Sequence, residues 1–225
     1  AIEPLQRALA IEDDLTEAHY LLGLCLRAEG RLKEALAAFN RTVAIEPAFT
    51  PAREELAQLH AALGRNRDAI EQLEALAALD PARPERLVTL GLTYARLGQP
   101  EAAILTLGRA AERYPDSPLV YTALGRVWLD LAEAHRDAIA LDKALEALAV
   151  VAERPDAASE ALTLYGRALL RAGRVTAAER TLQRATTRFP VERAAFRHLA
   201  DAAGRLGHRT LAEEAAARYA ALGSS

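Results

Sequence analysis

Apolar residues recur every three or four positions along most of the chain, with polar residues between them. Leu32, Leu36 and Phe39 show this spacing, which places apolar side chains along one side of a helix. No stretch alternates apolar and polar residues over the length of a strand, and the strong helix formers Ala, Leu, Glu and Arg dominate. Glycine and proline interrupt the pattern every 10 to 20 residues. The sequence therefore predicts an all-α fold built from many short helices.

These interruptions are periodic, with a period of 34 residues. Glycines are separated by this distance in both halves of the chain, at Gly30, Gly64 and Gly98 and then at Gly173 and Gly207. Prolines repeat at the same interval, at Pro47, Pro81 and Pro115. An alanine stands five residues after each of these glycines, at Ala35, Ala69, Ala103, Ala178 and Ala212. Agreement between several independent positions indicates a repeat architecture.

A 34-residue unit with Leu-Gly in its first helix, Ala-x-x-x-Phe in its second and a closing proline resembles the tetratricopeptide repeat (TPR). The segment AHYLLGLCLRAEGRLKEALAAFNRTVAIEP, residues 18–47, contains all three features. The resemblance covers essentially the whole chain and implies an all-α, right-handed α-solenoid superhelix of antiparallel helix pairs. In this register we expect one array over 1–225: a half repeat (second helix only) at 1–15, followed by repeats 16–49, 50–83, 84–117, 118–158, 159–192 and 193–225, the last being a C-terminal repeat or cap.

Two segments depart from the repeat pattern. Repeat 118–158 carries a seven-residue insertion, which predicts a lengthened helix pair with its turn near residues 135–142. A neutral surface insertion and a functional one both remain open for this segment. Residues 1–15 predict a second helix without its partner helix, so we expect the chain to be a segment of a longer protein.

The charge and the apolar content of the chain narrow the classes of function. The chain has 28 basic and 31 acidic residues, a net charge of -3, and so lacks the overall positive charge that attracts nucleic acid or an anionic membrane. No apolar run reaches the roughly 18 residues of a membrane helix. Cys25 is the single cysteine and cannot form an internal disulfide. We therefore expect no nucleic-acid partner and no membrane insertion.

Motifs for catalysis and for cofactors are missing from the sequence. There is no glycine-rich phosphate loop, no two histidines have the i, i+4 spacing of a helical metal site, and one cysteine does not make a zinc site. Acidic pairs such as Glu213 and Glu214 are typical of solvated helix faces. We expect no catalytic residue, no metal, no cofactor and no enzyme activity in this segment.

The resemblance also implies a binding surface. In the family, the first helix of each repeat faces the concave groove, and fixed positions of each repeat point into it. On this sequence those positions give the following candidates for the ligand-binding groove: Tyr20, Leu24, Arg27, Glu54, Gln58, Val88, Leu92, Arg96, Arg126, Arg167, Arg171, Arg197 and Arg205. The candidates are partly apolar in the first half of the chain and rich in arginine toward its C-terminus.

The charge distribution follows the same gradient. Residues 1–117 contain 13 basic and 18 acidic residues, a net charge of -5, whereas residues 159–225 contain 11 and 6, a net charge of +5. A guanidinium group binds a carboxylate through two parallel hydrogen bonds, so the C-terminal half favours an acidic ligand. The alternative is that many arginines are simply solvated, because arginine provides 26 of the 28 cations.

One ligand known for the family is disfavoured. Family members that capture a chaperone's C-terminal tail hold its carboxylate with Lys and Asn side chains. The corresponding positions here are Tyr20, Leu24, Glu54 and Glu55, which cannot form that clamp.

The sequence thus predicts a non-catalytic scaffold that binds a peptide or partner protein in its concave groove, with an acidic segment at the arginine-rich half. Two alternatives stay open: a substrate-recruiting repeat segment of a larger enzyme or envelope-assembly protein, and a self-associating module. The Arg, Ala and Leu bias is typical of GC-rich bacteria. Both the bacterial cytoplasm and the periplasm remain open as the location.

Overall fold

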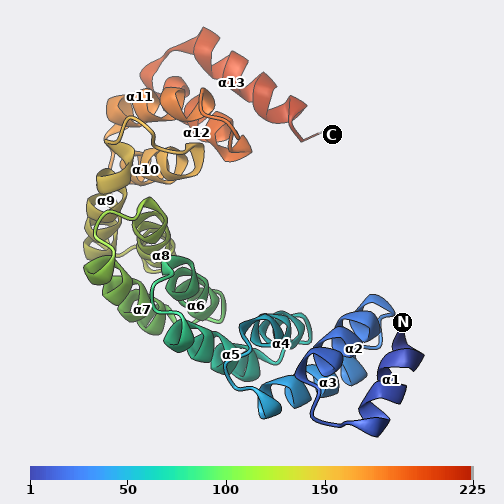
Figure 1. Ribbon diagram of the computed structural model, residues 1–225. Helices are drawn as coiled ribbons and strands as arrows, with labels where there is room; N and C mark the ends of the chain where they lie inside the picture. Colours follow the sequence, from blue (N-terminus) through green and yellow to red (C-terminus); the bar gives the residue numbers. More distant parts are fainter. Residues whose placement is uncertain (224–225) are drawn as a thin grey trace. The chain divides into compact units, whose positions relative to one another are not determined.

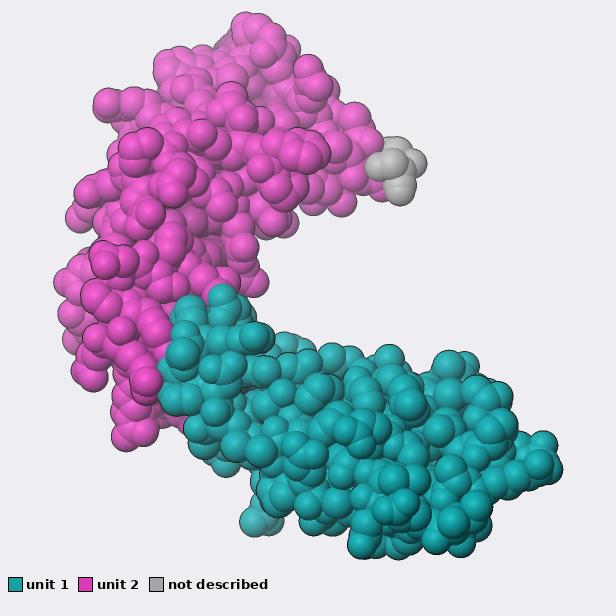
Figure 2. Space-filling view, viewed as in Figure 1, with its two compact units in different colours: residues 1–97 teal, residues 98–225 magenta. Residues whose placement is uncertain are grey.

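The computed structural model describes residues 1–223, and Figure 1 shows the path of the chain. Over this range the chain forms thirteen α-helices and no strand. The all-α fold predicted from the apolar spacing is therefore confirmed. The helices group into two compact units, unit 1 (Ala1–Leu97) and unit 2 (Gly98–Ser225), which Figure 2 colours separately.

Unit 1 contains six helices, and each of the first five packs on the next one along the chain. They are α1 (Ile2–Ile11), α2 (Thr16–Ala28), α3 (Leu32–Ile45), α4 (Thr50–Ala62), α5 (Asn66–Leu79) and α6 (Pro84–Arg96). Short turns join α2 to α3 and α4 to α5, so each of these pairs is an antiparallel hairpin (Figure 1).

Unit 2 contains the remaining seven helices of the described chain. They are α7 (Pro100–Arg113), α8 (Pro118–His135), α9 (Ala138–Ala152), α10 (Ser159–Arg171), α11 (Val175–Thr186), α12 (Arg193–Leu206) and α13 (Arg209–Ala221). Successive helices pack on each other, and α10 in addition contacts both α8 and α12. The first helices of neighbouring pairs therefore lie side by side in this unit.

Glycine ends several first helices because the turn needs a left-handed backbone. Gly30, Gly173 and Gly207 have φ angles of 76°, 73° and 79°. The residue after each glycine donates its N–H to the carbonyl five residues before it, as Arg31 does to Leu26 at 2.9 Å, which is the Schellman arrangement. A Cβ atom at these glycines would meet nothing within 4 Å. Backbone conformation, and not crowding, therefore selects glycine at these turns.

A different reason applies to three glycines inside first helices, Gly23, Gly125 and Gly166. A Cβ atom at Gly166 in α10 would lie 2.5 Å from Cγ of Leu182 in α11, closer than carbon atoms approach each other in packed interiors. Gly23 meets Phe39 in the same way. The absence of a side chain is what allows the two helices of each pair to pack this closely.

Helix α8 is longer than the other first helices. It has 18 residues, against 13 in α10, and it ends at Arg136, whose φ of 55° is left-handed. Asp137 then caps α9, because its carboxylate accepts hydrogen bonds from the backbone N–H groups of Ile139 at 2.8 Å and Ala140 at 3.2 Å. The turn between α8 and α9 is thus tight and fully hydrogen-bonded at the start of α9.

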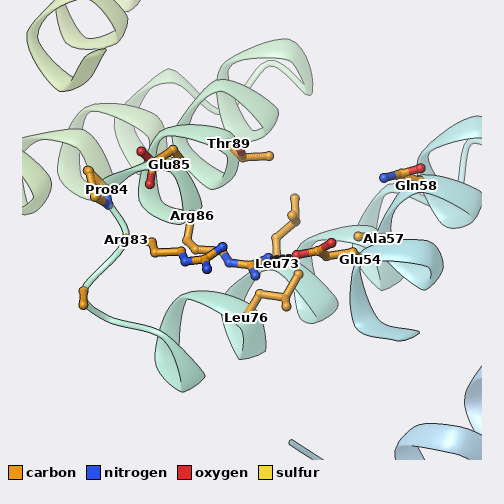
Figure 3. Close-up of a pocket in the computed structure, with 11 residues that line it drawn as sticks. Glu54, Ala57, Gln58, Leu73, Leu76, Arg83, Pro84, Glu85, Arg86 and Thr89 are labelled. Carbon is orange, nitrogen blue, oxygen red and sulfur yellow. Dashed lines mark ion pairs between the residues drawn. The ribbon is translucent and has the colours of Figure 1, made fainter. Parts of the chain in front are cut away.

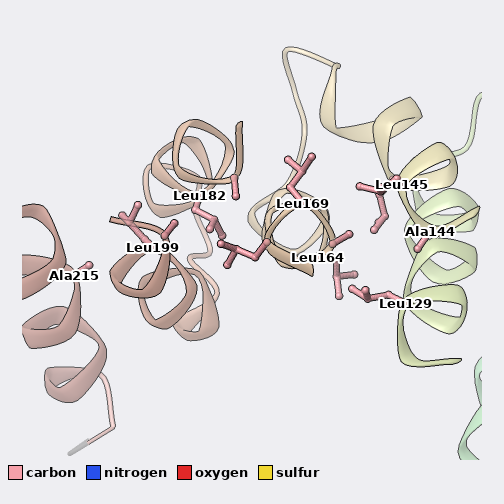
Figure 4. Close-up of a cluster of buried hydrophobic side chains, with 13 residues drawn as sticks. Leu129, Ala144, Leu145, Leu164, Leu169, Leu182, Leu199 and Ala215 are labelled. Atoms are coloured by element: carbon pink, nitrogen blue, oxygen red, sulfur yellow. The ribbon is translucent and has the colours of Figure 1, made fainter. Parts of the chain in front are cut away.

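Each unit has its own apolar core of leucine and alanine, with few aromatic side chains. The largest cluster in unit 2 joins α8 to α13 (Figure 4) and consists of Leu129, Ala144, Leu145, Leu148, Leu164, Ala168, Leu169, Leu170, Ala178, Leu182, Leu199, Ala202 and Ala215. The cluster of unit 1 consists of Leu26, Ala35, Leu36, Ala38, Phe39, Ala52, Leu56 and Leu59. Because every helix pair shares its apolar face with the next pair, burial is continuous along each unit.

Candidate binding surface

All thirteen residues proposed from the sequence lie on alternate helices of the chain. They occupy α2 (Tyr20, Leu24, Arg27), α4 (Glu54, Gln58), α6 (Val88, Leu92, Arg96), α8 (Arg126), α10 (Arg167, Arg171) and α12 (Arg197, Arg205). They differ in the packing contacts and ion pairs that they make within the protein. These contacts determine which side chains keep free hydrogen-bonding groups.

The apolar candidates of unit 1 take part mainly in packing. The ring of Tyr20 lies 5.8 Å from that of Phe39 and 5.1 Å from that of Phe49, measured between centroids. Leu24 packs against the same cluster. Val88 is buried, with 5% of its surface exposed. These contacts account for the three residue types without a ligand.

Four of the arginine candidates form ion pairs between neighbouring first helices, and Arg171 of α10, which pairs with Glu133 of α8, is one of them. Arg27 of α2 pairs with Glu55 of α4, and Arg126 of α8 pairs with Glu160 of α10. Arg167 of α10 pairs with Glu133 of α8. These guanidinium groups already have carboxylate partners inside the protein, so they contribute less free donor capacity than the sequence suggests.

Four of the C-terminal arginines line a single hollow of about 580 Å³, which we call the arginine hollow. It lies on α8, α10 and α12 of unit 2 and is lined by Glu133, Arg167, Leu170, Arg171, Arg197, His198, Asp201 and Arg205. The structure thus brings together four residues that the sequence placed in different repeats, and it adds Glu133 and His198, which sequence reasoning did not select.

Glu133 organises one side of the arginine hollow. Its carboxylate accepts hydrogen bonds from Arg167 Nε at 2.8 Å and from Arg171 Nε at 3.1 Å. Arg167 also donates to Asp130 at 3.1 Å. The hydrogen bond from Arg167, supported by that from Arg171, holds the pKa of Glu133 below its ordinary value. Glu133 is therefore ionised at neutral pH and fixes the positions of both guanidinium groups.

The other side of the arginine hollow carries donors that are not fully used. Arg205 donates from Nε to Asp201 at 2.9 Å. Arg197 has no carboxylate partner among residues 1–223, and its Nη2 lies 3.4 Å from Nε2 of His198. Burial, followed by the charges of Arg197 and Arg167, lowers the pKa of His198 to about 4. The ring is thus neutral at pH 7, and its Nε2 accepts from Arg197.

A second hollow of about 460 Å³ adjoins the first, and we call it the insertion hollow. It is lined by Ala132, Glu133, Arg136, Asp137, Ala138, Leu141 and Arg171. Glu133 and Arg171 belong to both hollows. The turn between α8 and α9, which lies in the repeat with the seven-residue insertion, therefore forms one wall of a continuous surface.

Unit 1 has a hollow of about 660 Å³ between α4, α5 and α6 (Figure 3). It is lined by Glu54, Ala57, Gln58, Leu73, Leu76, Ala82, Arg83, Pro84, Glu85, Arg86 and Thr89. Arg86 donates to Glu54 across it at 2.6 Å. Two arginines and two glutamates line this hollow, so it has no net charge to attract an acidic ligand.

The sequence contains a signal for Glu133 but none for His198, two lining residues of the arginine hollow that were not among the candidates. Glu133 precedes Arg167 by 34 residues, and Arg126 precedes Glu160 by the same distance. Opposite charges one repeat apart indicate ion pairs between neighbouring first helices. His198 follows a candidate position directly and carries no such signal.

In the part of the chain that the structure describes, no group of three or more His, Cys, Asp or Glu side chains is close enough to hold a metal ion. None of the helices in that part combines the length and the apolar character of a membrane span.

Two models of the tetratricopeptide repeat match the chain. One matches residues 26–85 and 60–127, and the other matches residues 1–48 and 163–225. Together the two models account for most of the sequence. The N-terminal segment 1–48 and the C-terminal segment 163–225 match the same model. No curated protein matches the chain.

Solved structures share the fold over nearly the whole chain. PilF of Pseudomonas aeruginosa is 17% identical, with a TM-score of 0.67, and the match covers 93% of this chain and 92% of PilF. PilW, a type IV pilus biogenesis factor, is 18% identical, with a TM-score of 0.66 and coverage of 92% and 93%. YrrB, described as a TPR protein with an unusual peptide-binding site, is 19% identical, with a TM-score of 0.60 and coverage of 88% and 98%. At these identities the similarity concerns the fold alone.

Proposed function

Because the chain belongs to the tetratricopeptide repeat family, we propose that it is a protein-interaction scaffold whose arginine hollow holds an acidic segment of a partner. Proteins of this family bind peptides or other proteins, and this chain has the same fold. In the proposal the segment performs no reaction of its own. The role is the same whether the segment acts alone or recruits a substrate for a catalytic domain elsewhere in a longer protein.

The observation that carries the proposal is the excess of guanidinium groups in the arginine hollow. Four arginines line it together with two carboxylates, those of Glu133 and Asp201. Arg197 is without a carboxylate partner in the described chain, and Arg171 and Arg205 each use only Nε in their ion pairs. Their remaining N–H groups are the donors that a carboxylate of a partner would accept.

The helices of unit 2 hold these donors in position before any ligand binds. Arg171 is held by Glu133, and Arg205 is held by Asp201 on its own helix. A ligand that meets side chains already ordered loses less entropy on binding. Micromolar affinity, about -8 kcal/mol, is a reasonable expectation for such a surface.

The test is binding of a fluorescein-labelled hexaglutamate peptide, followed by fluorescence anisotropy, with hexaglutamine as the neutral control. Hexaglutamate should bind, and its affinity should fall as salt is added because the contacts are ionic. The double variant Arg197→Glu, Arg205→Glu should bind about tenfold more weakly or worse, since two charge-assisted contacts are lost. Arg205→Glu gives up one exposed ion pair, with Asp201. Arg167 is a poorer choice for reversal, because a glutamate there would face both Glu133 and Asp130.

A matched control is available in the same unit. Arg180 on α11 and Arg218 on α13 are exposed and lie outside the arginine hollow. The double variant Arg180→Glu, Arg218→Glu makes the same change in net charge and should bind hexaglutamate with little change. Equal losses in the two double variants would show that net charge alone attracts the peptide, and the assignment of the arginine hollow would be wrong.

A further inference from the structure

The lengthened α8–α9 pair encloses the insertion hollow, which the proposed function does not use. Most of the polar groups around this hollow already have partners within the protein. The carboxylate of Glu133 binds Arg167 and Arg171, and that of Asp137 caps α9. Those groups therefore have little left to offer a polar ligand.

What remains around the insertion hollow is apolar surface, Arg136 and the unused N–H groups of Arg171. Ala132, Ala138 and Leu141 contribute the apolar side chains. Arg136 has no carboxylate partner among the described residues, and it lines the hollow together with the shared residue Arg171. A pocket that combines three apolar side chains with two arginines and two carboxylates already partnered within the protein suits an apolar side chain beside an acidic residue.

Arg136 occupies a backbone conformation that favours glycine. Its φ of 55° is the only positive value among the non-glycine residues of the described chain. At the corresponding turns the residue with the left-handed backbone is a glycine, namely Gly30, Gly173 or Gly207. An arginine at this position has a conformational cost that its side chain must offset through some other role.

We propose that the insertion hollow receives a leucine-sized apolar side chain that adjoins the acidic segment held in the arginine hollow. This inference rests on the proposed function and adds the class of partner sequence: an acidic run followed or preceded by one large apolar residue. Continuity supports it, because Glu133 and Arg171 line both hollows. Charge supports it as well, because the two linings together hold five arginines and three carboxylates.

The experiment compares four labelled peptides: pentaglutamate with leucine at its N-terminal or C-terminal end, and the same two peptides with alanine in place of leucine. One of the leucine peptides should bind about tenfold more tightly than its alanine counterpart, because leucine buries about three more carbon atoms. Equal binding of leucine and alanine peptides would overturn the inference and leave the proposed function standing. Failure of all four peptides to bind would overturn both.

Variants in the lining of the insertion hollow test whether the leucine side chain binds there. Ala138→Gln, at an exposed position that lines the hollow, should fill it and remove the preference. Ile139→Gln is the matched control, because Ile139 is 72% exposed and is not part of the lining. If Ala138→Gln keeps the preference, or if Ile139→Gln removes it, the insertion hollow is not the site.

A second variant separates binding from folding. Arg136→Gly should keep or raise the melting temperature, because glycine adopts the left-handed backbone without penalty. It should nevertheless weaken binding of the leucine peptides about threefold or more, since one charge-assisted contact is lost. Unchanged binding in this variant would remove Arg136 from the proposed site.

Discussion

At the scale of single residues, arginines that look alike in the sequence differ in what their side chains already hold. Arg126 and Arg167 pair with glutamates of the neighbouring first helix. Arg197 has no carboxylate partner in the described chain and contacts neutral His198. The arginines therefore fall into two groups. Some form ion pairs that join neighbouring helices, and others keep N–H donors that a binding partner could use.

Glu133 offers a test of this division. Glu133→Gln removes a negative charge from the lining of the arginine hollow. Hexaglutamate should therefore bind a few-fold more tightly, even though Arg171 loses the partner that orders it. The same change should lower the free energy of unfolding by about 1–2 kcal/mol, since Arg167 keeps only Asp130 as its acidic partner. Anisotropy titrations and denaturant unfolding of the same two proteins measure both effects.

The pH dependence of that variant follows from the lowered pKa of Glu133. A carboxyl group whose pKa is lower in the folded state stabilises the fold above its unfolded pKa, about 4.3. That contribution is lost as the pH falls through the folded value. The difference in melting temperature between wild type and Glu133→Gln should thus be full at pH 7 and shrink below about pH 4. A difference that grows in acid would contradict the assignment.

At the scale of elements, small residues set how closely the helices approach each other. The alanines at 35, 103 and 178 are fully buried in second helices. Gly23, Gly125 and Gly166 in first helices lie against large side chains of the partner helix, as Gly166 lies against Leu182. Helix propensity alone would favour alanine at such a position, so tertiary packing overrides local preference there.

Two glycine-to-alanine substitutions in first helices test this reasoning. Gly166→Ala should lower the free energy of unfolding by about 1–3 kcal/mol, because the new methyl group overlaps Leu182. Gly204→Ala in α12 is the matched control. A Cβ atom there would meet nothing within 4 Å, so the higher helix propensity of alanine should stabilise the protein by about 0.5–1 kcal/mol. Denaturant unfolding measures both, and loss of stability in Gly204→Ala would refute the packing argument.

At the scale of the whole molecule, stability is distributed along the array. The apolar clusters of units 1 and 2 are built from contacts between helices that are neighbours along the chain or one repeat apart. In such an array each repeat is coupled mainly to the repeats beside it. A destabilising substitution in one repeat should therefore lower the stability of that repeat and its neighbours, and not of distant repeats.

Hydrogen exchange followed by mass spectrometry can show this. Gly23→Ala in α2 would bring a methyl group against the ring of Phe39, and protection should fall in α1 to α4. Protection in α10 to α13 should stay as in the wild type, since those helices belong to unit 2 and have an apolar cluster of their own. An equal loss of protection along the whole chain would mean that the array unfolds as one cooperative body.

The sequence by itself determined the all-α fold and the chemistry of the turns. Helix periodicity is local, so Leu32, Leu36 and Phe39 predict their common face without knowledge of any neighbour. The turn glycines at 30, 173 and 207 are equally local, because they reflect the φ angle of one residue. The sequence also shows directly that the C-terminal half is rich in arginine, since this is a property of composition.

Tertiary structure alone decided which of those arginines are paired and where the hollows lie. Whether Arg167 meets Glu133 or a ligand depends on the distance between α8 and α10, and that distance is set by packing between helices one repeat apart. The lowered pKa of His198 likewise needs burial and, besides its chain neighbour Arg197, the charge of Arg167 from α10. Binding capacity is a property of such non-local distances, whereas the period of the repeat is a property of the chain.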